Sequence, residues 1–223
     1  MQNKSYKYEN IQIGNFLISI GYYLNELKYK HPVSFNLHQQ TPNDFTIGDL
    51  FGKFSGKFFI IEFKNSQESL KTELKKRQRV KLISRLNNDF KEYTNLSIMG
   101  HLICYPTFNN QEMEFNLEPY VTIQNEKFSR YKINNCKDFL LNIIDKKSIG
   151  IEFNEIEKYI ELLKKCSAED GNKNIEGVSS GIFLNFEKEK GIAHINSRFL
   201  NLRREIRLEV GIAVGTLTVL RDI

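Results

Sequence analysis

Apolar residues near the start of the chain recur at helical spacing. Over residues 14–30 they gather on one side of a helical wheel, which predicts an amphipathic helix. That face consists of Phe16, Leu17, Ile20, Tyr23, Leu24 and Leu27. The helix is expected to end at His31-Pro32, because a proline disfavours the helical conformation of the residue before it.

The spacing then changes to that of strands. Residues 33–40, 45–51 and 57–64 are short runs rich in aromatic and β-branched side chains, bounded by polar residues and glycine. The segment from Gly52 to Gly56 is expected to form the turn of a hairpin between the last two strands.

A long polar helix and a buried strand are predicted next. Residues 67–92 have a helical composition, and residues 97–105 form a nearly continuous apolar run that is typical of a strand buried on both faces. The order helix, three strands, helix, strand indicates an α/β fold with a mixed central sheet flanked by helices.

The second half of the chain predicts an α+β extension. Strands are expected at 113–123, 181–187, 191–195 and 210–220, and helices at 135–147 and 154–166. No Pro- or Gly-rich linker separates the halves. We therefore expect a core over residues 1–110 and an extension over residues 111–223 that packs on it as one compact unit.

Composition narrows the class of protein. With 40% hydrophobic and 26% charged residues among 223, the chain is typical of a folded domain and unlike a disordered chain or a multispanning membrane protein. The apolar run at 210–220 is too short to cross a bilayer, so no membrane partner is expected. The net charge of +5 permits a polyanionic partner without requiring one.

The three cysteines predict no metal or disulfide framework. Cys104, Cys136 and Cys166 are far apart in the sequence and have no CxxC or histidine spacing around them. Reduced thiols, with no secretory signal at the start of the chain, favour a cytoplasmic protein.

One group of charged residues interrupts the apolar strand pattern. Glu62 and Lys64 end the strand at 57–64, and both are expected on the same face because alternate residues of a strand point the same way. Asp49 lies on the preceding predicted strand, across the hairpin, where its carboxylate can approach that of Glu62. A carboxylate at the edge of an apolar core needs a compensating partner.

Two converging carboxylates favour a hard cation with oxygen ligands, of which Mg²⁺ is the first candidate and Mn²⁺ the second. Asp49, Glu62 and the backbone carbonyl of Phe63 are the predicted ligands. Such a metal polarises a phosphoryl oxygen and lowers the pKa of a bound water. Lys64 would hold or activate that water and counter the charge growing on the phosphate.

The segment IGDLFGKFSGKFFIIEFK, with Asp49, Glu62 and Lys64, resembles the signature of the PD-(D/E)xK nuclease superfamily. The order of predicted elements is similar to that family's restriction-endonuclease-like core. The resemblance implies a metal-dependent nuclease whose catalytic residues are these three, serving restriction, antiviral defence, recombination or repair. One departure is Gly48, which stands where the family often has proline.

The resemblance also suggests two auxiliary residues. Some family members add an acid from the first helix, for which Glu26 is the candidate, although a solvated glutamate on the flank of a helix fits it as well. Certain exonuclease-like members carry a glutamine on the helix after the lysine, and Gln78 could match it. Asp44 competes weakly with Asp49 for the role of the aspartate.

A basic segment follows the predicted site. Seven basic residues and one acid, Glu73, lie between positions 71 and 85. The candidates for contact with a nucleic-acid backbone are Lys71, Lys75, Lys76, Arg77, Arg79 and Lys81. A solvated charged face remains the alternative. The apolar positions of the segment change sides partway, so either the helix bends near Arg77 to Val80 or its first half faces a partner.

The histidines carry weaker signals. His101, within an apolar run, is expected to be a core histidine with a hydrogen-bond partner. His38 follows the first strand and is expected in an exposed loop, with a place facing the site as the alternative.

Taken together, the residues predict a Mg²⁺-dependent nuclease that hydrolyses phosphodiester bonds, with DNA favoured over RNA. A homodimer and a partner protein from a multi-gene system are further expectations. The alternatives are an RNA-directed nuclease and a non-catalytic nucleic-acid-binding or scaffolding module of the same fold. A structural salt bridge on the hairpin would explain the three charged residues without any activity.

Overall fold

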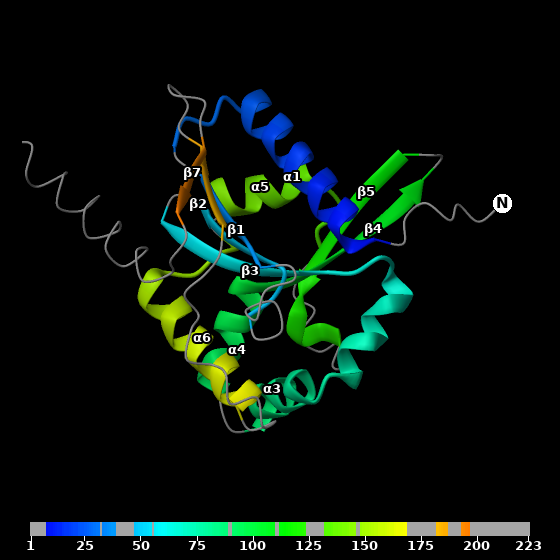
Figure 1. The fold of residues 1–223 in the computed structure, drawn as a ribbon, viewed down its shortest axis with the longest axis vertical. Coiled ribbons are helices and arrows are strands. Elements are labelled where there is room, and N and C mark those ends of the chain that lie inside the picture. Colours follow the sequence, from blue (N-terminus) through cyan, green and yellow to red (C-terminus); the bar gives the residue numbers. More distant parts are fainter. Residues whose placement is uncertain are drawn as a thin grey trace, which may run out of the picture.

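The computed structural model describes residues 8–31, 33–38, 47–54, 56–88, 91–109, 112–123, 132–145, 148–168, 182–186 and 193–196. These residues form an α/β fold in which a mixed sheet is flanked by helices on both faces (Figure 1). The predicted fold class is therefore confirmed at this level.

The elements follow the predicted order in the first half of the chain. They are α1 (Glu9–Glu26), β1 (Val33–Leu37), β2 (Leu50–Phe54), β3 (Lys57–Phe63), the 3₁₀ helix η2 (Gln67–Lys75), α3 (Arg77–Asn88), α4 (Lys91–Gly100) and β4 (His101–Asn109). The second half adds β5 (Glu112–Pro119), the 3₁₀ helix η3 (Tyr120–Ile123), α5 (Cys136–Ile144), α6 (Phe153–Ala168), β6 (Ile182–Phe186) and β7 (Ala193–Asn196).

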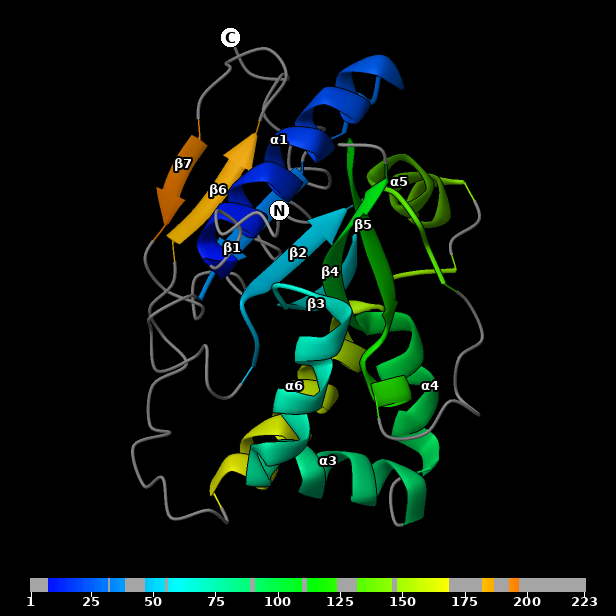
Figure 2. The same ribbon diagram turned by 90° about the vertical axis from the view of Figure 1, so that its right-hand side faces the viewer.

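The sheet has seven strands in the order β5-β4-β3-β2-β1-β6-β7. Strands β1, β2 and β3 are antiparallel neighbours, and β4 pairs parallel to β3. The parallel pair requires a crossover, which η2, α3 and α4 supply. Helices α1 and α5 cover one face of the sheet, while α3, α4 and α6 lie on the other (Figures 1 and 2).

The extension shares this sheet with the core. Strand β5 pairs with β4, and β6 pairs with β1 at the other end of the sheet. Strands β6 and β7, which match the strands predicted at 181–187 and 191–195, pair with each other. Helices α5 and α6 each contribute buried side chains to one of the two hydrophobic clusters. The predicted strand at 210–220 lies outside the described residues.

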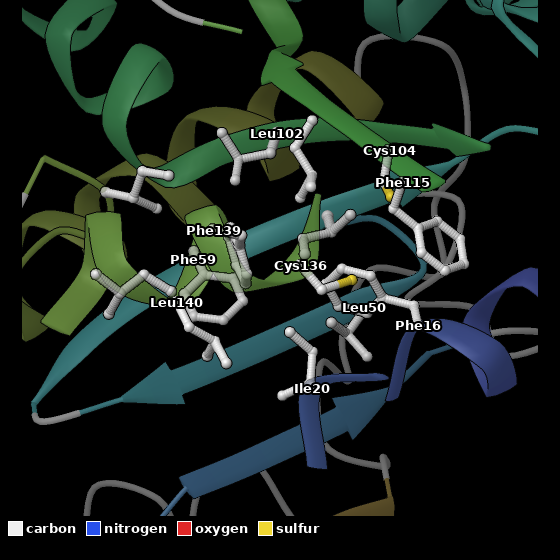
Figure 3. Packing of buried hydrophobic residues seen from close by; sticks show 14 of the residues in the cluster. Phe16, Ile20, Leu50, Phe59, Leu102, Cys104, Phe115, Cys136, Phe139 and Leu140 are labelled. Atoms are coloured by element: carbon white, nitrogen blue, oxygen red, sulfur yellow. The ribbon is translucent and has the colours of Figure 1, made fainter. Parts of the chain in front are cut away.

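Two apolar clusters hold the layers together. In the first, Phe16 of α1 makes edge contacts with Phe63 and Phe115 and a tilted contact with Phe139 of α5, with ring centroids 5.3–5.8 Å apart (Figure 3). The second lies between the opposite face and α3, α4 and α6. Strand β3 is buried on both faces, so the charged residues at its end are held by rigid neighbours.

The first helix is displaced from its prediction. Helix α1 begins at Glu9 instead of residue 14 and ends at Glu26, five residues before His31. Lys28 has a φ of +52°, a left-handed conformation that turns the chain away from the helix before the proline is reached. The predicted apolar face is nevertheless the one that packs on the sheet.

The hairpin turn was predicted too early. Gly52 lies within β2 opposite Phe59, and the turn comes after Phe54, which pairs with Lys57. A Cβ on Gly52 would lie 2.2 Å from Cζ of Phe59, so the glycine makes room for that ring instead of making a turn. Gly56, at φ +78°, occupies the turn.

The segment at 67–92 is not one continuous helix: it divides just before the stretch from Arg77 to Val80 where a bend was one of the two alternatives. The break falls at Lys76, whose ψ of 109° is extended, between η2 and α3. Leu70 and Leu74 of η2 can therefore pack against the same cluster as Ile83 of α3.

The strand predicted at 97–105 starts later than expected. Residues 97–100 complete α4, and β4 begins at His101. A Cβ on Gly100 would approach Cδ1 of Ile151 to 2.7 Å, so the helix ends where the chain passes close to a neighbouring segment. Among the described residues, no helix is both long and apolar enough to cross a membrane.

Candidate active site

Strand register brings the predicted acids together. Leu50 pairs with Ile61 in the β2–β3 hairpin, so one step further along places Asp49 opposite Glu62. Both side chains are buried, with 3% and 2% of their surface exposed. The hairpin therefore juxtaposes the two acids, although Asp49 precedes β2 and was predicted to lie within it.

Backbone contacts fix Asp49. Its Oδ2 accepts a hydrogen bond of 2.6 Å from the backbone N–H of Phe63, and its carbonyl accepts one of 2.9 Å from the backbone N–H of His38. The carboxylate is thus tied directly to the strand that carries Glu62.

The backbone at Gly48 excludes the proline that the resembling signature often has at this position. Its φ of +141° is closed to proline, whose ring holds φ near −65°. A Cβ there would lie 2.9 Å from Cγ2 of Ile60 and 3.5 Å from Oε2 of Glu62. Glycine is therefore required both by the backbone conformation and by the close approach to β3.

The ammonium of Lys64 lies among oxygen atoms. Its Nζ donates to the carbonyl of Phe63 at 2.7 Å and to Oε1 of Glu62 at 3.0 Å. The same nitrogen is 3.1 Å from Oε1 of Glu73 and 3.5 Å from Oε1 of Glu9. Glu62 and the Phe63 carbonyl, two of the three predicted metal ligands, thus point to the same position, and the ammonium of Lys64 occupies it.

Two further cations surround Glu62. Nζ of Lys76 is 3.0 Å from Oε1, and a guanidinium nitrogen of Arg79 is 3.5 Å from Oε2. Arg79 is 1% exposed and lies 5.4 Å from the ring centre of Tyr120. Both carboxylate oxygens of Glu62 therefore face positive charge.

These charges determine the protonation of the pair. Burial acts to raise the pKa of Glu62, but Lys64, Arg79 and Lys76 outweigh it and hold that pKa well below the usual range. Burial acts to lower the pKa of Lys64, and Glu62 and Glu73 outweigh it in turn, so that pKa is raised. At neutral pH the two side chains are a carboxylate and an ammonium.

Glu73 is a site residue that the sequence did not single out. It is fully buried, 2.8 Å from Nζ of Lys76, and its Oε2 accepts a hydrogen bond of 2.6 Å from the hydroxyl of Tyr120. Its signal in the sequence is weak: it is the single acid in a strongly basic stretch. It reaches the site from η2, which only residues 64–66 separate from the end of β3, and its Oε1 lies 3.1 Å from Nζ of Lys64.

The first helix contributes an acid, but it is Glu9 and not Glu26. Glu26 pairs with Lys137 of α5, where both side chains are 42% exposed. Since Glu9 and Glu26 are 17 residues apart on one helix, about 25 Å separates them along its axis. The proposed auxiliary role of Glu26 is therefore contradicted by its position.

Gln78 lies on α3 immediately before Arg79 and is 3% exposed. Its Nε2 is buried and has no hydrogen-bond partner among the described residues. No contact places Gln78 with Glu62 or Lys64, so its role remains a prediction. Asp44, the competing aspartate, lies outside the described residues.

The basic segment splits into two groups. Lys71, Lys75 and Arg77 are exposed, as a backbone-binding surface requires, and Lys81 is partly buried. Lys76 and Arg79 instead turn toward Glu62 and Glu73. The site meets solvent at Lys76 and Glu9, whose side chains are 37% and 34% exposed.

The histidines divide between core and site. His101 is buried, stacks on Tyr120 at 4.2 Å and shares a hydrogen bond of 2.9 Å with the hydroxyl of Tyr159, as expected of a core histidine. His38 is buried and not exposed, and its Nδ1 is 3.3 Å from the carbonyl of Gly48. Burial lowers the pKa of His38 to about 4, so the ring is neutral beside Asp49.

The donor set suits a hard cation in its chemistry, because the converging groups are carboxylates and a backbone carbonyl. Within the described part of the chain, no group of three or more His, Cys, Asp or Glu side chains is arranged to hold a metal ion. The cations of Lys64, Lys76 and Arg79 surround the carboxylates in this arrangement. A metal bound by Asp49, Glu62 and the Phe63 carbonyl would take the place of the Lys64 ammonium between the last two.

Comparison with protein-family models, with curated proteins and with solved structures finds no match to this chain. The geometry of the site therefore carries the functional argument.

Proposed function

We propose that this protein is a metal-dependent nuclease that hydrolyses phosphodiester bonds in DNA, built on a restriction-endonuclease-like core. The observation that carries the proposal is the placement of Asp49 opposite Glu62, with the ammonium of Lys64 between Glu62 and the Phe63 carbonyl. The antiparallel β1–β2–β3 unit with β4 parallel to β3 supports the same core.

Each residue then has a definite task. Asp49, Glu62 and the carbonyl of Phe63 would hold Mg²⁺ or Mn²⁺, which supplies a Lewis acid for the phosphate and a bound water of lowered pKa. Because its pKa is raised, Lys64 is a charged donor and not a base at neutral pH. It would orient the attacking water and stabilise the negative charge that develops on the phosphate.

The surrounding cations fit an anionic substrate. Lys76 is the exposed cation at the mouth of the site, and Lys71, Lys75 and Arg77 extend the positive surface along η2 and α3. Such a surface could follow a nucleic-acid backbone without reading its sequence.

A cleavage panel tests this proposal. Purified protein is incubated with supercoiled and linear duplex DNA, single-stranded DNA and RNA, in Mg²⁺, Mn²⁺ or EDTA. Glu62→Ala and Lys64→Ala are expected to reduce metal-dependent cutting of DNA at least a hundredfold. Two matched controls should cut normally: Lys57→Ala, at the far end of the same strand, and Glu26→Gln, at the far end of α1.

The other outcomes are informative. Cutting of RNA alone would keep the chemistry and overturn the choice of DNA. Binding without cutting in any metal would favour the non-catalytic module, for which the full pairing of Glu62 with cations is the supporting observation. Cutting that survives in both variants would exclude this site.

A further inference from the structure

The outer face of α1 carries exposed apolar side chains. Ile18, Tyr22 and Ile11 are 73%, 66% and 41% exposed, and Tyr8, the N-cap residue just before the helix, is 65% exposed. The opposite side of the same helix packs on the sheet through Phe16 and its neighbours (Figure 3). Helix α1 lies at the outside of its layer (Figure 1), and the exposed fractions of these side chains show that this second apolar face meets solvent.

The spacing of these residues is regular. Within α1, positions 11, 15, 18 and 22 are separated by steps of four and three, the pattern of a seam between two helices. Tyr8, the N-cap residue, has an extended backbone. Asn15 occupies the middle position, with Ile11 and Ile18 on either side and a tyrosine at each end. Four exposed apolar residues scattered over the surface would need no explanation, but a continuous seam on one helix does.

Two glycines beside the seam have no partner within the described chain. Gly14 and Gly21 are one heptad apart and therefore lie on the same side of α1, next to Ile18. Glycine weakens a helix interior relative to alanine, yet a Cβ at either position would meet nothing within 4 Å. Contacts within the described part of the chain do not require these glycines, whereas the close approach of another helix would.

The face is also free of charge. Between Glu9 and Glu26 no residue of α1 is ionisable at neutral pH, although a quarter of the chain is charged. Two copies of a protein of net charge +5 repel one another overall, and residues close to a two-fold axis lie near their own counterparts in the second copy. An uncharged face near the axis therefore adds no local repulsion to such a contact.

The helical part of the seam is symmetric about Asn15, which has Ile11 on one side and Ile18 on the other. In an antiparallel pair of α1 helices, Ile11 would face Ile18 of the second copy, and Tyr22 would lie near the start of the other helix. The two-fold axis would then pass near Gly14 and Asn15, where the smallest side chain permits the closest approach. Antiparallel helices also set their dipoles in the favourable sense.

We infer that the outer face of α1 is a self-association surface, which binds a second copy of this chain through an antiparallel α1–α1 contact. The inference rests on α1 alone and not on the proposed nuclease. A helix of 18 residues is about 27 Å long and about 10 Å wide. A footprint of about 270 Å² per protomer is well below the roughly 800 Å² of a standard interface, so the dimer should be weak, with Kd on the order of 10 μM.

Sedimentation equilibrium of the full chain tests the surface. The wild type should pass from monomer to dimer between about 1 and 200 μM. Ile18→Lys places two like charges near the axis and should raise Kd at least thirtyfold. Val80→Lys, the same kind of change at an exposed aliphatic residue of α3, is the matched control and should leave Kd unchanged. A wild type that stays monomeric at 200 μM, or a dimer that Ile18→Lys leaves intact, would overturn the inference.

Cysteine cross-linking tests the orientation. The native thiols of Cys104, Cys136 and Cys166 are buried, so an introduced cysteine is the accessible one. Under mild oxidation, a mixture of Ile11→Cys and Ile18→Cys proteins should form mainly the mixed dimer. Cross-linking of each variant chiefly with itself would show a parallel pair and contradict the antiparallel arrangement.

The glycines provide an independent readout. Gly21→Ala should raise the melting temperature measured at 1 μM by about 2–4 °C, because alanine favours the helix and nothing obstructs its Cβ. The same change should weaken the dimer, because the added methyl group separates the two helices. A gain in melting temperature with an unchanged Kd would exclude close approach at Gly21.

Discussion

The substitution Glu62→Gln tests the electrostatics of the site most directly. Glutamine keeps the shape of the side chain and removes the charge that Lys64, Lys76 and Arg79 share. Lys64 and Lys76 keep Glu73 at 3.1 and 2.8 Å, but Arg79 keeps it only at 3.8 Å. Of the three cations, the buried guanidinium of Arg79 therefore loses the largest part of its compensating negative charge.

Removing one partner of a buried ion pair destabilises a protein by about 3–5 kcal/mol. Because Glu73 still compensates two of the three cations, we take the lower end, about 3 kcal/mol. For a chain of 223 residues this lowers the melting temperature by about 6–12 °C. Glu26→Gln, which removes an exposed partner of Lys137, is the control and should leave the melting temperature nearly unchanged.

The pH dependence of the difference follows from the depressed pKa of Glu62. The stabilisation by its carboxylate is fully present above the unfolded pKa of about 4.3 and is lost as pH falls toward the folded value. The gap between wild type and Glu62→Gln should therefore stay constant from pH 8 to 5 and shrink only below that. His38, whose pKa is lowered by burial, destabilises both proteins alike below its usual pKa and cancels from the difference.

Thermal melts monitored by circular dichroism at half-unit pH intervals measure this gap. A Glu62→Gln protein that melts within 2 °C of wild type across the whole pH range would show that burying the three cations does not require the charge of Glu62. A gap that already narrows between pH 7 and 5 would contradict the depressed pKa.

Two further predictions concern the hairpin and the metal. Gly52→Ala sets a Cβ 2.2 Å from the ring of Phe59, so we expect the free energy of unfolding, measured in urea, to fall by about 1–3 kcal/mol. Adding Phe59→Leu should recover part of this loss. An unchanged free energy of unfolding would mean that the ring moves freely. Mn²⁺ at about 100 times its Kd should raise the melting temperature of the wild type by about 5–10 °C and should raise that of Glu62→Gln far less. Equal rises in the two proteins would mean that the metal binds elsewhere.

The order of the central elements could be predicted because it depends on local signals. The nearly continuous apolar run over 57–64 forms a strand that is buried on both faces, and the helical spacing over 14–30 marks the helix face that packs on the sheet. Strand register then brought Asp49 opposite Glu62 almost without further information.

The misplaced boundaries depend on tertiary contacts that no local pattern records. Gly52 resembled a turn residue, but the ring of Phe59 requires it inside a strand. Gly100 resembled part of an apolar strand, but it ends α4 against Ile151. In each case the glycine marks a close approach of segments that are distant or opposed in the fold.

The members of the site divide in the same way. Glu62 and Lys64 stood out because they are charged at the end of an apolar strand. Glu73 and Glu9 did not stand out, because each is one polar residue in a polar stretch. Only the positions of η2 and of the start of α1 in the fold bring them to Lys64. A sequence can thus mark the strand-borne part of a site while the helices that complete it stay hidden.

The charge balance of the completed site connects these residues to chemistry. The four carboxylates of Glu9, Asp49, Glu62 and Glu73 stand against the three cations of Lys64, Lys76 and Arg79, a formal sum of 3 − 4 = −1. Burying such a cluster costs more than a hydrophobic core of the same volume, so stability alone does not account for it. A residual negative charge attracts a further cation. The ammonium of Lys64, displaced by that cation, and the exposed ammonium of Lys76 would then be placed to meet an anion. A metal and a phosphate would together satisfy both halves of the cluster, and for this reason we favour catalysis over a structural salt bridge.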